Sequence, residues 1–359
     1  MPSSPLAPAK LIDIEAASFL AMLSAQEAVA TGRRAGARRL PRFIRAKGMQ
    51  AADRRLPDID FTGSELDGSS FARTDLSRAV LFGASLRGCD FSQATLVRSD
   101  LRGARLGGAV LTGANLDGAD MRGALMVFAD AIGAAPASQV EARPEHGADF
   151  TNCSLKGANL RNANLKGARF DNANLDGADL TGARTEGARF RGAILTNAKL
   201  SALAISRDEL AQCVLDPAPS KPDDVLAIQI ALAEAESWVG SRGQAGRPVR
   251  LANVDLRVAG PAYAGRRLSG GDFSGACGVG LDFSGSQLIG ATFSGADLRG
   301  AKFQNADLRG ANFRGANLAH ASFLGADLTA IQMLSGQEKR VDFSGAILHG
   351  TGLHVAWLS

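Results

Sequence analysis

Long apolar runs are missing from this chain, and their absence argues against a membrane-spanning or a secreted protein. No stretch of 18 or more apolar residues occurs, so a membrane-spanning helix is not expected. The opening residues, MPSSPLAPAK, lack the apolar stretch of a secretory signal peptide. We therefore expect a cytoplasmic location.

Cysteine, tyrosine and tryptophan are also scarce, and their scarcity argues against an enzyme core. The chain has 1 Tyr, 2 Trp and 4 Cys, beside 42 Gly. Cys89, Cys153, Cys213 and Cys277 do not have the spacing of a metal site. The glycines recur with a turn period, and none opens a helix after a strand as a phosphate-binding loop requires. We expect no cofactor, no metal and no catalysis.

What the chain has in abundance is one phrase of five residues, clearest in Ala291–Leu328. A small residue is followed by a polar one, then by Leu or Phe at the centre, then by two residues that lead into a turn. The centres of this stretch are Phe293, Leu298, Phe303, Leu308, Phe313, Leu318, Phe323 and Leu328. Alanine stands two residues before each of these centres.

A period of five fits neither a helix nor an uninterrupted strand. It fits a short extended piece, with the centre and the small residue pointing inward, followed by a turn with Gly or Asn at positive φ. Four such pieces would close a square coil of 20 residues, and coils would stack about 4.8 Å apart. Polar residues on either side of each centre would point outward, so the many Asp and Arg predict a solvated surface and not acid–base pairs.

These repeats resemble those of the pentapeptide-repeat proteins, whose phrase is A-(D/N)-L-x-x. The resemblance covers three blocks, with centres from Phe61 to Met126, from Phe150 to Leu200 and from Leu268 to Leu358. It implies an all-β solenoid: a right-handed quadrilateral β-helix, here with an N-terminal helical segment and a helical insertion. Some relatives in this family protect DNA gyrase by imitating duplex DNA.

Departures from the repeat predict the division of the chain. We expect a helical and basic arm at 1–56, a β-helix at 57–200 with a loop at 134–147, a helical insertion or hinge at 201–257, and a second β-helix at 258–359. In the arm, an apolar helical face is formed by Ile12, Ala16, Phe19, Leu20 and Leu23. This helix would cover the open edge of the first coil. The helices of the insertion would either cover another end or pack on the side of the rod.

The spacing of the phenylalanines predicts which side chains stack in the core. Residues 20 apart lie on the same side of successive coils. The core positions singled out by this rule are Phe150, Phe170, Phe190, Phe273, Phe293, Phe313, Phe283, Phe303 and Phe323. Gly278 and Glu338 stand at centres where an apolar side chain is expected, and we predict a local bulge at Glu338 because an unpaired charge is costly in so thin a core.

Charge is concentrated in one segment, residues 32–55. It contains Arg33, Arg34, Arg38, Arg39, Arg42, Arg45, Lys47, Arg54 and Arg55 against the single acid Asp53. That segment is +8, so the remainder of the chain is −4 at a net charge of +4. The repeat blocks 59–126, 148–200 and 266–358 carry −1, +3 and +1. A DNA mimic needs a strongly acidic rod, so that function is disfavoured.

The sequence therefore predicts a non-catalytic scaffold that binds proteins of unknown identity through its faces and non-repeat segments. The basic residues leave three alternatives open: docking on protein, contact with nucleic acid, or contact with anionic lipid. A homodimer through the C-terminal end near Trp357 is a further expectation. A secreted effector and an enzyme within 201–257 are the remaining alternatives, and neither has a recognisable motif.

Overall fold

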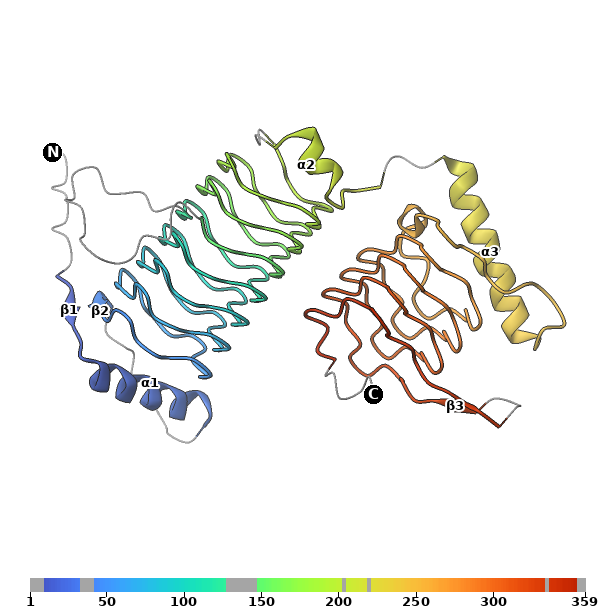
Figure 1. Ribbon diagram of the computed structural model, residues 1–359, viewed down its shortest axis with the longest axis horizontal. Helices are drawn as coiled ribbons and strands as arrows, with labels where there is room; N and C mark the ends of the chain where they lie inside the picture. The colour runs from blue at the N-terminus through green and yellow to red at the C-terminus, as the bar shows by residue number, and fades with distance from the viewer. Residues whose placement is uncertain are drawn as a thin grey trace. The chain divides into compact units, whose positions relative to one another are not determined.

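The computed structural model divides the chain into two compact units, Met1–Leu215 and Asp216–Ser359 (Figure 1). The described residues are 10–32, 42–126, 147–201, 205–217, 221–332 and 336–353. Each unit is a stack of coils with its own apolar core.

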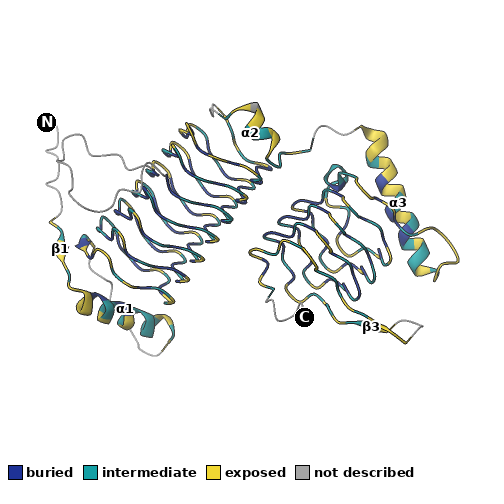
Figure 2. Ribbon diagram, viewed as in Figure 1, coloured by how far each residue is buried: buried dark blue, intermediate teal, exposed yellow. Residues whose placement is uncertain are grey.

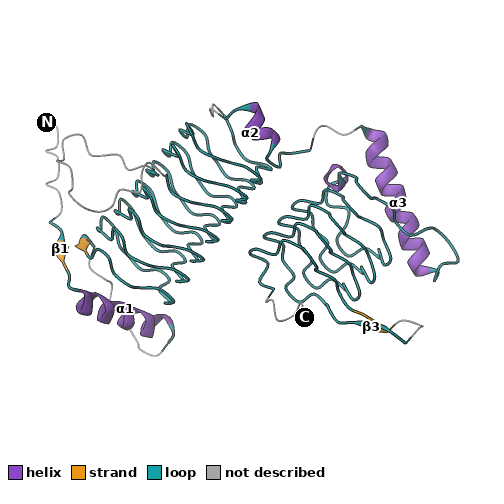
Figure 3. Ribbon diagram, viewed as in Figure 1, coloured by secondary structure: helices purple, strands orange, loops and turns teal. Residues whose placement is uncertain are grey.

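Coils in both units are held together by parallel bridges, most of which join residues 20 apart. In the first unit the series begins with Arg45 bridged to Glu65, and Asp75 is bridged in turn to Thr95. The N–H of each centre donates to the next coil, as Leu76 does to the carbonyl of Thr95 at 2.7 Å. This register agrees with the expectation that four repeats make one coil. Each bridge is a single residue, so most of each coil is drawn as loop (Figure 3).

The centres and the small residues before them form the buried core of the coils. Figure 2 shows buried residues recurring along the coils of both units. Phe150, Phe170 and Phe190 are completely or almost completely buried, and successive rings lie 4.9 and 5.0 Å apart with interplanar angles of 5° and 6°. The second unit has two such columns, which are Phe273–Phe293–Phe313–Phe343 and Phe283–Phe303–Phe323. Near-parallel rings at this spacing are offset-stacked pairs, which add to the stabilisation from burial.

The N-terminal elements cover the first coil. Strand β1 (Ile12–Asp13) pairs in parallel with β2 (Ile44–Arg45), and helix α1 (Ala16–Ala30) follows it. Phe19 and Leu23 of α1 are fully buried, and the ring of Phe19 lies 6.1 Å from that of Phe61. The prediction that Ile12 belongs to the helical face is wrong: its backbone satisfies the sheet edge and its side chain is 52% exposed.

The predicted boundary of the arm at residue 56 is too late. Bridges start at Arg45, and the inward positions Ala46, Ala51 and Leu56 are buried in the stack. The sequence hides this start because alanine stands at two of the centres, where Leu or Phe marks later repeats. The described part of the expected arm is thus a strand and a helix, followed from Phe43 onward by coil.

The predicted insertion at 201–257 is likewise shared between the two units. Helix α2 (Arg207–Ala211) is capped by Ser206, whose side chain accepts the N–H of Glu209 as a capping box predicts. The helix ends four residues before the expected Leu215. Helix α3 (Pro222–Gly240) buries Ile228, Leu232 and Ala235 in the second unit. By Arg250 the bridges have resumed, and the 3-10 helix η1 (Leu256–Ala259) lies within the new stack.

Insertions are accommodated without loss of register. The bridge between Asn312 and Asp342 spans 30 residues, and the ten extra residues include the antiparallel hairpin of β3 (Ile331–Gln332) and β4 (Glu338–Lys339). The bulge expected at Glu338 is this hairpin, which holds the carboxylate exposed. The bridge between Val110 and Asp149 spans a larger insertion. Of the loop predicted at 134–147, residues 134–146 lie outside the described residues.

Candidate interaction surfaces

The nine basic residues singled out from the sequence fall into two groups. Outside the described residues lie Arg33, Arg34, Arg38 and Arg39. On the first coil lie Arg42, Arg45, Lys47, Arg54 and Arg55. The second group is part of the rigid stack and not of a flexible arm.

Acidic residues of the next coil compensate much of this second group. Arg42 Nε lies 2.6 Å from Asp60, and Arg45 Nε lies 2.9 Å from Glu65, which Lys47 also contacts at 3.1 Å. Partial burial works against the charged form of Glu65, but the hydrogen bonds from Arg45 and Lys47 hold its pKa below the ordinary value. These cations are therefore engaged within the coil, and a nucleic acid or lipid would have to compete for them.

Arg54 instead contributes to the attachment of helix α1. Its guanidinium donates to Ser24 Oγ at 3.1 Å and lies 3.4 Å from Glu27. Glu27 also accepts the backbone N–H of Arg55, whose own side chain is exposed. Arg54 therefore helps to hold helix α1 on the first coil. The binding role predicted for the nine basic residues stays a prediction.

The flat sides of the coils carry a pattern that our sequence reasoning missed. An Asp and an Arg flank the same Leu or Met centre, and the Arg guanidinium donates two hydrogen bonds to the Asp carboxylate. We call this arrangement a D-x-R fork. Among the described residues the forks are Asp100–Arg102, Asp120–Arg122, Asp255–Arg257, Asp297–Arg299 and Asp307–Arg309. The signal was present as the recurring D-L-R of the phrase, because residues two apart on an extended side point the same way.

These forks keep the outward charges both fixed and balanced. Arg102 donates to Asp100 at 2.8 and 2.7 Å, and this side-chain hydrogen bonding lowers the pKa of the Asp100 carboxyl. Arg102 also lies 3.9 Å from Asp120 on the next coil, so neighbouring forks are linked. The two-point geometry of Arg with a carboxylate gives these side chains a defined direction.

One side of the first unit combines this fixed charge with an exposed aromatic ring. Its outward residues, one per successive coil, are Thr62, Phe82, Arg102, Arg122 and Arg161; we call it the Phe82 face. The Phe82 ring is 47% exposed and the guanidinium of Arg102 lies over it, 5.3 Å from the ring centre. Aromatic and Arg side chains together are typical of the energetically important part of protein interfaces.

Corner residues make a second set of ion pairs, now between coils. Arg73 donates two hydrogen bonds of 2.6 Å to the Asp53 carboxylate, and Arg78 donates two of 2.7 Å to the Asp58 carboxylate. All four residues have a φ near +60°, a conformation that costs a residue other than glycine some stability. These paired residues occupy corner positions at which glycine stands in other coils. The first coils therefore carry ion pairs at their corners at the cost of a less favourable backbone conformation.

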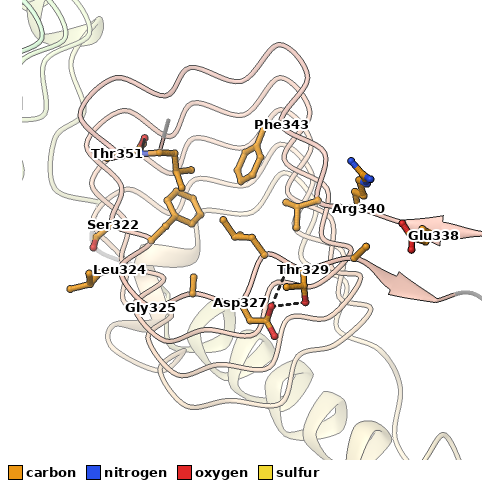
Figure 4. A pocket seen from close by; sticks show the side chains of 16 residues that line it. Ser322, Leu324, Gly325, Asp327, Thr329, Glu338, Arg340, Phe343 and Thr351 are labelled. Carbon is orange, nitrogen blue, oxygen red and sulfur yellow. Dashed lines mark hydrogen bonds between the residues drawn. The ribbon is translucent and has the colours of Figure 1, made fainter. Parts of the chain in front are cut away.

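The end of the second stack has a hollow of about 860 Å³ (Figure 4). Phe323, Leu328, Phe343 and Leu353 line its apolar part. At its edge the Asp327 carboxylate accepts the N–H and the hydroxyl of Thr329, at 3.0 and 2.7 Å. Figure 4 shows Phe343 pointing into the ring of the coil, with Arg340 and Glu338 to one side on the hairpin.

Two cysteine thiols, those of Cys89 and Cys153, are buried within the coils. No cluster of three or more His, Cys, Asp or Glu that could hold a metal occurs among the described residues. Burial raises the pKa of the Cys89 thiol to about 12, and burial raises the pKa of Cys153 as well, so both thiols stay protonated at neutral pH. None of the described helices is long and apolar enough to cross a membrane. Trp357, near which a homodimer was expected, lies outside the described residues.

The family model for pentapeptide repeats matches eight copies over residues 59–126, 146–204 and 267–330, which is more than half of the chain. No protein with a curated description matches.

Three solved structures are among those that match this chain. A pentapeptide repeat protein from the Arabidopsis thaliana thylakoid lumen is 28% identical over 36% of this chain and 73% of its own, with a TM-score of 0.27. HetL, involved in heterocyst differentiation regulation in the cyanobacterium Nostoc sp. strain PCC 7120, is 20% identical over 90% and 99%, with a TM-score of 0.19. QnrB1, a plasmid-mediated fluoroquinolone resistance protein, is 17% identical over 85% and 90%, with a TM-score of 0.22.

Proposed function

The chain belongs to the pentapeptide-repeat family, and from this membership we propose a function without chemistry: a rigid scaffold that binds other proteins. We infer that each unit winds as the right-handed quadrilateral β-helix implied by the family. The free thiols Cys89 and Cys153 suit a reducing compartment such as the cytoplasm.

The observation that carries the proposal is the Phe82 face. A scaffold must offer side chains at fixed positions, and here a repeated bridge register sets their spacing while the D-x-R forks set their direction. Preorganised side chains lose little conformational entropy on binding. Phe82 supplies a large apolar contact, and the alternating Asp and Arg around it supply a charge pattern by which one partner is distinguished from another.

A partner for this face would present an apolar pocket for Phe82, with carboxylates and basic groups around it in the complementary order. The solved relatives HetL and QnrB1, which are described by regulatory and resistance roles, are consistent with action through a partner. The near-neutral repeat blocks argue against a mimic of duplex DNA.

The test is affinity capture from native cytosol with the full chain and with the variant Phe82→Asp. We expect one protein partner to be retained after nuclease treatment and to be lost with Phe82→Asp, because a charge in the centre of the contact would be desolvated. The matched control is Leu324→Asp, which places the same charge on an outward position of the second unit that is 76% exposed. Equal capture by wild type and Phe82→Asp would contradict the proposed face.

A second candidate function rests on the basic residues outside the described part. Replacing Arg33, Arg34, Arg38 and Arg39 together by Gln tests it and leaves every residue of the described coils unchanged. Deleting residues 1–56 would not, because it would also remove the first coil and its cover. Recovery of nucleic acid or anionic lipid by the full chain at low salt, lost in this variant, would favour an electrostatic anchor over the scaffold.

A further inference from the structure

Two neighbouring sides of the first stack meet at a corner that carries exposed positive charge. The bridge between Asn164 and Arg184 joins two successive coils on one side, and the bridge between Arg169 and Arg189 joins them on the next. Several long cationic side chains on these two sides are exposed to solvent. We call this group the basic corner, and its residues are Lys166, Arg184, Arg189 and Arg191.

Arg189 and Arg191 depart from the D-x-R forks of the other coils. Both flank the same centre, so they point to the same side, yet the position before the centre, which is Asp in a fork, is Arg here. Arg189 is also bridged to Arg169, and like charges directly opposite in adjacent strands repel each other. Asp149 and Asp171 compensate Arg169, at 3.4 and 3.6 Å. Arg189 and Arg191 therefore concentrate positive charge where the fold alone would favour an acid.

Charge is distributed unevenly around the coils that contain this corner. In residues 164–192, the two sides that meet at the corner have five cations against two acids, a net charge of +3. The other two sides have Asp176 and Asp179, a net charge of −2. Within the corner, Glu186 is an exposed acid that lies 3.7 Å from Arg184. Such a separation of charge is unfavourable for the fold, and departures of this kind from local rules are expected at functional sites.

We propose that the basic corner binds a carboxylate-rich segment of a partner protein. A guanidinium group can donate two parallel hydrogen bonds to one carboxylate, so Arg189 and Arg191 can each bind one acidic side chain of the segment. The corner itself passes through Gly167 and Gly187, which have φ values of +67° and +69°. Because neither glycine has a side chain, the main chain of an extended peptide can lie between the cations of the two sides.

The size of the corner favours a peptide over a nucleic acid. Its four cations lie on two successive coils, which are about 4.8 Å apart. A nucleic acid is held along a longer track of phosphates, and its affinity depends on the number of phosphates that the protein neutralises. A short acidic peptide can satisfy the whole corner.

The basic corner and the Phe82 face belong to different sides of the stack. Within one coil, the side of Phe170 is two sides further along the chain than the side of Arg161, which belongs to the Phe82 face. In a coil of four sides these two lie opposite each other. The first unit can therefore hold two partners at once, and binding at the basic corner does not require binding at Phe82.

The experiment measures the affinity of the full chain for fluorescein-labelled octaglutamate by fluorescence anisotropy at low salt. We expect Arg189→Gln combined with Arg191→Gln to weaken binding by about tenfold or more, because two carboxylates lose their two-point contacts. The matched control combines Arg98→Gln with Arg242→Gln, which removes the same charge from two exposed positions elsewhere and should change the affinity by less than about twofold. All proteins compared carry Gln at four positions outside the described residues, so that these cations do not contribute to binding: Arg33, Arg34, Arg38 and Arg39.

Arg189→Lys combined with Arg191→Lys separates charge from geometry. This variant keeps the positive charge but loses the two-point contact, so we expect an affinity between those of the unchanged corner and the Gln pair. An affinity equal to that of the unchanged corner would overturn the two-point contact.

Other outcomes would overturn the proposal as a whole. These are no measurable binding of octaglutamate to the unchanged corner, or equal affinities of the Gln pair at the corner and the control pair. Tighter binding of duplex DNA or of phosphatidylserine vesicles than of octaglutamate, lost in the Gln pair at the corner, would assign the corner to nucleic acid or lipid instead. Phe82→Asp should bind octaglutamate as the unchanged face does, so failure of the Phe82 face and failure of the basic corner give different results.

Discussion

At the scale of the residue, the surface of the coils is governed by short charge pairs that local sequence sets. An Asp and an Arg on either side of one centre must point to the same face, and the fork geometry then follows from side-chain length. The forks balance the surface charge without any contribution from distant parts of the chain. They also make the coils sensitive to acid.

The acid sensitivity has a definite sign, illustrated by Asp100. Because Arg102 lowers the pKa of this carboxyl in the folded state, the folded chain binds protons less readily than the unfolded chain. The stabilisation is present above the unfolded pKa of about 4 and is lost as the pH falls through the lower, folded pKa. We expect Arg102→Gln to reduce stability at pH 7 by about 0.5 kcal/mol, given the exposure of the pair, and to weaken the dependence on pH between about 5 and 3.

Urea unfolding of the full chain across this pH range checks the prediction. Arg98→Gln is the control, since exposed Arg98 makes no ion pair within the described residues. Identical pH profiles for Arg102→Gln and wild type would show that the fork contributes nothing to acid stability.

At the scale of the element, the first coil depends on its cover. A stacked coil leaves unpaired N–H and C=O groups at its end, and such edges promote association. Here β1 supplies hydrogen bonds, since the N–H groups of Ile12 and Ile14 donate to Phe43 and Arg45, while α1 supplies apolar contact.

Phe19→Asp should therefore detach α1 from the coil. Burying an unpaired carboxylate against Phe61 is unfavourable, so we expect a loss of several kcal/mol locally and association of the uncovered ends. Ser18→Asp introduces the same side chain at an exposed neighbouring position and should behave as wild type. Light scattering with limited proteolysis between 10 and 32 measures both effects, and a protease-resistant monomeric Phe19→Asp would contradict the covering role.

At the scale of the whole molecule, the two units have separate cores and should unfold separately. Phe170→Asp places a charge between two stacked rings of the first unit, and we expect it to destabilise that unit by several kcal/mol while the second unit keeps its unfolding transition. Arg161→Ala, at an outward position with a long 3.8 Å ion pair to Asp179, should change stability by less than about 0.5 kcal/mol. Hydrogen exchange resolved by segment measures each unit, and equal loss of protection in both would mean one cooperative fold.

Much of this molecule could be predicted from its sequence because each coil repeats a local rule. The columns of Phe150, Phe170 and Phe190 follow directly from a spacing of 20. The start of the first stack could not be predicted, because Ala46 and Ala51 lack the bulk that marks a centre. Strand β1 could not be predicted either, because a strand of two residues is too short to show an alternating pattern. The Phe82 face depends on which coils lie next to each other. The bridge step of 39 residues from Val110 to Asp149 changes this order, and the repeat pattern does not predict that step.

The bridge register has a consequence for how such a chain changes over generations. Since most bridges join residues 20 apart, an in-frame loss or gain of twenty codons removes or adds one whole coil and rejoins the ladder in phase. A slip of five codons instead rotates every later face by one side. Recombination between similar stretches of the gene can thus alter the length of a stack at little cost to its fold, and the faces it presents keep their alignment.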